Sequence, residues 1–88
     1  MPIQYDPEKA AANLRLHDVS FADAERVLYD PLAVTIEDPD AVGERRFVKI
    51  GLGNSGQLLL VVYTERDDDY RLISVRRPTR KERKSYEG

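Results

Sequence analysis

The segment that decides the fold is residues 46–77, RFVKIGLGNSGQLLLVVYTERDDDYRLISVRR. Apolar residues in it recur at the two-residue period of β-strands, and its middle part is apolar on both faces, as in a central strand. The predicted strands are 46–52, 58–63 and 70–77, joined by the polar turns GNSG and ERDDD. Strict alternation in the last strand places Ile73 and Val75 on one face and Arg76 on the other. The segment therefore predicts an antiparallel meander.

In the part of the chain before this segment, apolar residues recur every three to four positions, as they do in an amphipathic helix. The predicted elements there are helices at 7–16 and 20–29, then a strand at 33–36. Asp6 and Ser20 are suited to cap the two helices, and Pro7 fits the first helical position. Ala10 and Leu14, with Ala11, form the apolar stripe of the first helix. We expect the two helices to form an αα-hairpin on one face of the sheet.

The two ends of the chain add short elements. Residues 3–5 alternate like an edge strand, and the sequence leaves open whether they pair with the meander or only cover its edge. Thr79 and Glu82 form a capping box that begins a short C-terminal helix after Pro78. The fold class is therefore α+β, with two N-terminal helices packed on a four-stranded antiparallel meander. With 88 residues, the chain is expected to be a single domain, residues 1–88.

Composition restricts the chemistry. The chain has no cysteine and one histidine, so neither a disulfide nor a multi-His or Cys/His metal site can be built, and we expect no metal and no cofactor. It contains no apolar run of membrane-helix length, and its start has no basic and apolar regions typical of a signal peptide. The sequence thus predicts a cytoplasmic protein that does not contact membranes.

Charge is distributed unevenly along the chain. The formal net charge is −2, yet residues 70–88 carry seven Lys and Arg against two Glu, a net of +5, which leaves −7 on residues 1–69. One interpretation is a solvated terminal helix whose basic residues interact favourably with the helix dipole. The other is a surface that binds phosphate.

Spacing makes the phosphate interpretation specific. Arg76 projects from a strand end, and Arg80 and Arg83 lie one turn apart on the helix that follows, so three guanidinium groups can converge on one phosphate. Glu82 and Tyr86 share a second face of that helix. We expect further contacts to RNA from Lys49, Arg77 and Lys81.

These residue types suffice for metal-free RNA cleavage, in which a ribose 2′-OH attacks the adjacent phosphate. Glu82, or Lys49 with a lowered pKa, could accept the 2′-OH proton. The arginines would stabilise the phosphate charge, and Tyr86 could donate to the leaving oxygen or position the base. His17 is better explained as a structural residue between the two N-terminal helices. The residues leave open which group is the base and which the acid.

Short stretches over nearly the whole chain also follow a family pattern. They are YDPEKA at 5–10, NLR at 13–15, HDVSF at 17–21, Ala24, DPLA at 30–33, ERRF at 44–47, IG at 50–51, VVYTE at 61–65, ISVR at 73–76, RKER at 80–83 and YE at 86–87. In this order they resemble the BrnT toxins. The sequence departs from the family at Asp18, where Gly is usual, and at Val75 and Pro78, where small residues are common.

The resemblance implies a RelE-like fold and a ribosome-independent endoribonuclease that slows translation. It also implies neutralisation by a BrnA-type ribbon-helix-helix antitoxin, through which the complex would bind operator DNA. The family function is carried over onto the C-terminal strand and helix, at Arg76, Arg80, Glu82, Arg83 and Tyr86. The alternative function is a non-catalytic binding module, whose basic C-terminal surface holds an acidic partner protein or operator DNA.

Overall fold

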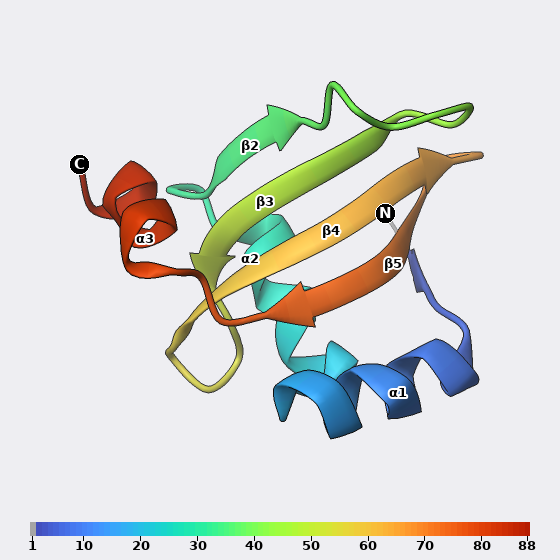
Figure 1. Cartoon of the computed structure of the whole chain (residues 1–88), viewed down its shortest axis with the longest axis horizontal. Coiled ribbons are helices and arrows are strands. Elements are labelled where there is room, and N and C mark those ends of the chain that lie inside the picture. Colours follow the sequence, from blue (N-terminus) through green and yellow to red (C-terminus); the bar gives the residue numbers. More distant parts are fainter. Residues whose placement is uncertain (1) are drawn as a thin grey trace.

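The computed structural model describes residues 2–88 and contains a five-stranded sheet in the order β1-β5-β4-β3-β2 (Figure 1). The strands are β1 (Ile3–Gln4), β2 (Val34–Glu37), β3 (Arg46–Leu52), β4 (Leu58–Arg66) and β5 (Asp69–Arg76). Strands β2 to β5 pair antiparallel in chain order. β1 pairs parallel with β5, where Ile3 lies opposite Tyr70. Strands β2 to β5 thus form the predicted four-stranded meander, and β1 pairs with its edge, which makes the whole sheet mixed and five-stranded.

The helices are α1 (Pro7–His17), a 3₁₀ turn (Phe21–Ala24), α2 (Glu25–Tyr29) and α3 (Arg80–Glu87). The expected capping residues are confirmed: Asp6 accepts from the Glu8 N–H, and Ser20 accepts from the Ala22 N–H. The predicted second helix is instead a 3₁₀ turn continued by a short α-helix. No helix within residues 2–88 is long and apolar enough to cross a membrane.

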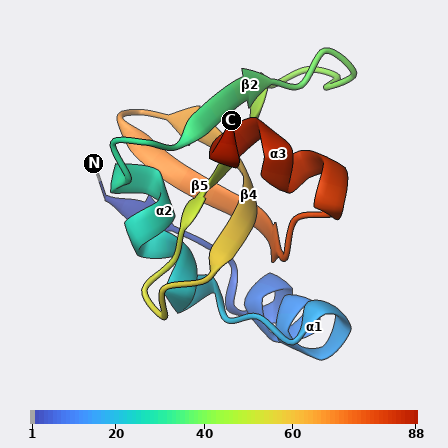
Figure 2. The same ribbon diagram turned by 90° about the vertical axis from the view of Figure 1, so that its left-hand side faces the viewer.

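The core lies between the 3₁₀ turn with α2 and one face of the sheet. Its fully buried members are Val19, Phe21, Ala24, Val27, Leu28, Leu59, Val61, Tyr63, Leu72 and Val75. α3 lies on the other side of the sheet from α2 (Figure 2). We call the sheet face that carries the core the inner face and the face toward α3 the outer face. Burial of this apolar inner face supplies the main stabilisation of the fold.

β5 departs from the predicted alternation. The pairing of β4 with β5 runs from Val62 opposite Ser74 to Tyr63 opposite Leu72, so it skips Ile73. This bulge adds one residue to β5, and it brings Leu72 onto the inner face together with Val75. The expectation that Ile73 shares the face of Val75 is therefore wrong, whereas Arg76 lies on the outer face as predicted, opposite Leu60.

α1 does not form a hairpin with α2 on one face. It runs along the edge of β5 beyond the end of β1 (Figure 1). Asn13 holds it there: its amide nitrogen donates to the Val75 carbonyl at 2.7 Å, and its amide oxygen accepts from the Val75 N–H at 3.1 Å. Of the predicted apolar stripe, Ala10 packs against the core, whereas Leu14 is 50% exposed and the buried residue of α1 is Asn13. A polar side chain, more than an apolar stripe, therefore fixes this helix.

Candidate functional site

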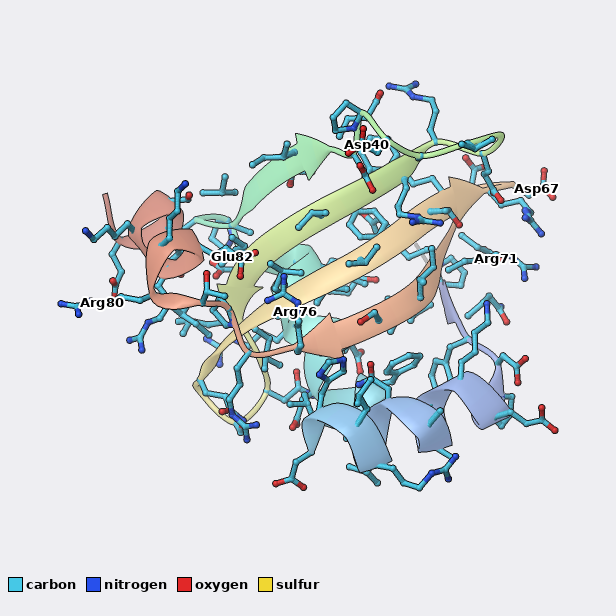
Figure 3. The ribbon with its side chains drawn as sticks, viewed as in Figure 1. Asp40, Asp67, Arg71, Arg76, Arg80 and Glu82 are labelled. Atoms are coloured by element: carbon cyan, nitrogen blue, oxygen red, sulfur yellow. The ribbon has the colours of Figure 1, made fainter. Side chains whose placement is uncertain are left out.

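A bidentate salt bridge between Arg76 and Glu82 joins the end of β5 to the start of α3. The Arg76 guanidinium donates from Nη1 to Oε1 of Glu82 at 2.8 Å and from Nη2 to Oε2 at 2.9 Å. Glu82 also completes the predicted capping box, since it accepts from the Thr79 N–H at 2.8 Å and its own N–H donates to the Thr79 hydroxyl at 3.2 Å. Figure 3 shows Arg76 and Glu82 close together, where the chain passes from strand to helix.

Electrostatics keep this carboxylate ionised. The hydrogen bonds from Arg76 lower the pKa of Glu82 to about 2, with a smaller contribution from the Thr79 N–H and in spite of partial burial. The same pairing raises the pKa of Arg76. A carboxylate with so low a pKa, and with both oxygens occupied, is poorly suited to accept the proton of a ribose hydroxyl at neutral pH.

An open hollow of about 490 Å³ lies between α3 and the β3–β4 hairpin. Its lining residues are Leu52, Gly56, Gln57, Leu58, Arg77, Pro78, Arg83, Tyr86 and Glu87. We call it the α3 cleft. Arg77 enters it from the end of β5, donating to Gln57 Oε1 at 3.3 Å and to the His17 carbonyl at 3.2 Å. Nη2 of Arg83 lies 3.6 Å from Oε2 of Glu87, which is one helical turn further along α3. Two guanidinium groups, a phenol and a carboxylate thus meet in the cleft.

Asp30 fixes the phenol in the α3 cleft. The Tyr86 hydroxyl donates to Oδ2 of Asp30 at 2.8 Å, and the same carboxylate accepts from the N–H groups of Leu52 and Leu32, each at 2.9 Å. The Leu52 N–H is the largest cause of a lowered pKa at Asp30. In turn, the hydrogen bond to Asp30 raises the pKa of Tyr86, so the phenol keeps its proton at neutral pH.

This approach of Asp30 to the sheet depends on a small residue at position 51. A Cβ atom on Gly51 would lie 3.0 Å from Oδ2 of Asp30, so a larger residue would push the carboxylate away. The end of α2, the end of β3 and the last turn of α3 are thereby connected through one side chain.

The other predicted residues lie apart from the α3 cleft. Arg80 is exposed and points away from Arg76 and Glu82 in Figure 3, bordering with Arg83 a second open hollow of about 540 Å³. Lys81 is exposed on α3. Lys49 lies on the inner face, where its ammonium donates to the Leu28 carbonyl at 2.8 Å. The structure brings together Arg77, Arg83 and Tyr86, and it places the Arg76–Glu82 pair beside them.

Three residues of this region were absent from the predicted site. Gln57 and Glu87 line the α3 cleft, and Asp30 holds Tyr86. Spacing on the last helix could have indicated Glu87, because it lies one turn from Arg83. No local pattern indicates Asp30, which is 56 residues from Tyr86.

The fold and this site define a class: a small α+β domain with one mixed sheet and an arginine-rich junction between its last strand and last helix. A family model described as the ribonuclease toxin BrnT of type II toxin–antitoxin systems matches residues 5–82. The chain therefore belongs to the BrnT family of ribonuclease toxins. The matched residues include Arg76, Arg80 and Glu82, whereas Arg83 and Tyr86 follow them.

Among solved structures, the chain is similar to the crystal structure of the ribonuclease toxin BrnT from Brucella abortus. The TM-score is 0.70 at 22% sequence identity, with 91% of this chain and 99% of that chain covered. At that identity the likeness shows a common fold. No curated protein matches the chain.

Proposed function

We propose that the chain is a metal-independent endoribonuclease toxin of RelE-like fold that cleaves RNA in the α3 cleft without a ribosome. The observation that carries the proposal is the meeting of Arg77, Arg83 and Tyr86 around one hollow of about 490 Å³. Guanidinium groups bind phosphate oxygens through paired N–H donors, and their charge stabilises the additional negative charge of a phosphorane. Membership in a ribonuclease toxin family supports RNA as the polymer.

In the proposed reaction, the ribose 2′-OH attacks the adjacent phosphorus and the 5′-oxygen of the next nucleotide leaves. The products are a 2′,3′-cyclic phosphate and a 5′-OH end, whose oxygen takes its proton from water in the open cleft. Arg83 and Arg77 hold the phosphate, Arg76 contributes positive charge from beside the cleft, and Arg80 and Lys81 bind the flanking backbone. The low pKa of Glu82 makes it a positioning residue for Arg76 in this scheme.

The proton acceptor in this scheme is Glu87. It is the carboxylate that borders the α3 cleft, and it lies 3.6 Å from Arg83. Tyr86, held by Asp30, keeps its proton and offers its oxygen to position the attacking hydroxyl. Lys49 takes no part in the scheme, because it lies on the inner face and is bound to Leu28.

As a type II toxin, the protein would act in the cytoplasm, inhibit translation and growth, and be neutralised by a protein antitoxin. We propose a BrnA-like ribbon-helix-helix antitoxin, through which the complex binds operator DNA. The support for this partner is the family membership together with the resemblance of the sequence to BrnT toxins.

Incubation of the purified protein with RNA in EDTA tests the proposal. We expect shortened fragments with cyclic phosphate ends, and a loss of roughly 100-fold or more in cleavage rate for Arg83→Ala. Arg15→Ala, which removes an exposed arginine from α1, is the matched control. Intact RNA that is retained only in low salt would instead favour the non-catalytic binding module, and equal rates for both variants would remove Arg83 from the site.

A further inference from the structure

A second basic hollow lies at the opposite end of the sheet from the α3 cleft. It has a volume of about 430 Å³ and lies where the start of α1 meets the beginning of β3, the end of β4 and the beginning of β5. Four cations border it, namely Lys9, Arg46, Arg66 and Arg71, and two carboxylates, Asp6 and Glu44. We call it the hairpin hollow.

Both carboxylates of the hairpin hollow already have partners. Asp6 accepts from the Glu8 N–H at 2.8 Å as the cap of α1. Glu44 accepts from Nε and Nη2 of Arg66, and this pairing is the largest cause of its lowered pKa, to which Arg71 also contributes. The acidic groups of this hollow are therefore occupied by a helix N-terminus and by one arginine.

In the described part of the chain, two of the cations make no direct contact with a carboxylate, although Arg71 is close enough to Glu44 to help lower its pKa. Within residues 2–88, the side chains of Lys9 and Arg71 make no hydrogen bond and no ion pair, and Arg46 reaches only to 4.0 Å from Asp38. Tyr5 adds an aromatic ring to the same hollow, 47% exposed, with its edge-to-face contact to Phe21 at 5.3 Å between ring centres. Cations that form no ion pair, next to an exposed ring, can receive a phosphate and an adjoining base.

The hairpin hollow is connected to the α3 cleft by the outer face of the sheet. Arg71 lies opposite Thr64 and Arg76 opposite Leu60, and these partners are four residues apart on β4, so both arginines face outward. Because the bulge at Ile73 takes up one residue, the two positions are separated by four rises of about 3.3 Å, or roughly 13 Å. Figure 3 shows them toward opposite ends of that strand. A single-stranded chain of a few nucleotides could span this separation.

We propose that the hairpin hollow is a second nucleotide-binding subsite, in which Lys9 and Arg71 hold a phosphate of the RNA whose cleavage is assigned to the α3 cleft. The inference rests on the proposed function and extends it from one phosphate to a bound length of RNA. Tyr5 favours a nucleotide over an acidic peptide as the occupant, because an aromatic face stacks on bases of any sequence.

Fluorescence anisotropy with a ten-nucleotide 2′-O-methyl RNA tests the subsite, since that RNA lacks the attacking hydroxyl and stays intact. Arg71→Ala and Lys9→Ala should each weaken binding about fivefold at about 0.1 M salt and lower the salt slope by about 0.7. Arg71→Lys should recover most of the loss because it keeps the charge. The control Arg15→Ala removes an exposed charge from α1 outside the hollow and should stay within about twofold. A dinucleotide, whose single internucleotide phosphate can occupy only one of the two sites, should show a smaller loss for Arg71→Ala.

The outcomes separate the subsite from the catalytic proposal. Suppose that the wild-type protein cleaves RNA and that Arg71→Ala binds the ten-nucleotide RNA with the same affinity as Arg15→Ala. The subsite proposal is then wrong, and the catalytic proposal stands. If RNA is bound and not cleaved, yet Arg71→Ala weakens binding as expected, the subsite stands and the catalytic proposal fails. If Arg71→Ala changes only the capture of the antitoxin, the hairpin hollow is a protein-binding surface and the subsite is overturned.

Discussion

Arg76 and Glu82 form a bidentate salt bridge across the junction of β5 and α3, with nitrogen–oxygen distances of 2.8 and 2.9 Å. The arginine ends the last strand and the glutamate occupies the third position of the last helix. This interaction, together with the bond from Tyr86 to Asp30, therefore sets the angle at which α3 leaves the sheet. Because the α3 cleft is bordered by this helix, the geometry of the cleft depends on the pair.

Alanine substitutions at Arg76 and Glu82 should show coupled effects on stability. We expect a double-mutant cycle in chemical denaturation to give a coupling energy of about 1–2 kcal/mol. Glu82→Gln retains a side-chain acceptor for the capping box, so it should cost less than Glu82→Ala by roughly 1 kcal/mol. Additive single-variant effects would show that the ion pair contributes no net stability.

Acid should destabilise the protein through Glu82. The pKa of this group is about 2 in the folded protein, against an ordinary value of 4.5, so its contribution is complete above about pH 4.5 and is lost as the pH falls toward 2. The full displacement corresponds to ~3 kcal/mol, which solvent screening of a pair whose side chains are about one-third exposed reduces to roughly 1–2 kcal/mol. Unfolding free energies measured across this range should fall less steeply in Glu82→Gln. Parallel curves for the two proteins would refute the assignment.

Local signals in the sequence predicted the elements well. The cap at Asp6 and the capping box of Thr79 with Glu82 are confirmed, because each depends on residues within one helical turn. The strands of the meander also appear where alternation predicts them, since the inner face must be apolar. The same locality explains why Arg76 could be placed on the outer face from its strand position alone.

Contacts between residues far apart in the sequence cannot be predicted from local signals. Asn13 bonds to Val75 across 62 residues, and Tyr86 bonds to Asp30 across 56. The bulge at Ile73 shifts the phase of β5 without a glycine or proline to indicate it. The predicted convergence of Arg80 with Arg76 is wrong for a related reason. The direction in which α3 leaves the sheet is set by the contacts of Glu82 with Arg76 and of Tyr86 with Asp30, and helical spacing does not reveal it.

The bond between Tyr86 and Asp30 should be visible in the titration of the phenol. Asp30→Asn weakens the hydrogen bond to Asp30 and removes the negative charge, both of which raise the pKa of Tyr86, so spectrophotometric titration should show that pKa returning toward 10.0. Tyr86→Phe should cost about 1 kcal/mol of stability, and Asp30→Ala more, since it leaves the Leu52 N–H without its acceptor. An unchanged Tyr86 titration in Asp30→Asn would place the phenol elsewhere.

Replacing Asn13 should lower the free energy of unfolding more than replacing most other polar residues of the chain. It is buried and makes three hydrogen bonds, two to Val75 and one to the Val19 carbonyl at 3.1 Å. Asn13→Ala leaves the Val75 N–H and carbonyl unpaired beneath α1, so we expect a loss of about 2–4 kcal/mol in denaturant unfolding. Asn13→Asp should lose at least as much, because a carboxylate cannot donate to the two carbonyls. Leu16→Ala, on the same helix but 77% exposed, should change stability by less than about 0.5 kcal/mol. Equal costs at the two positions would mean that α1 is held by its apolar residues after all.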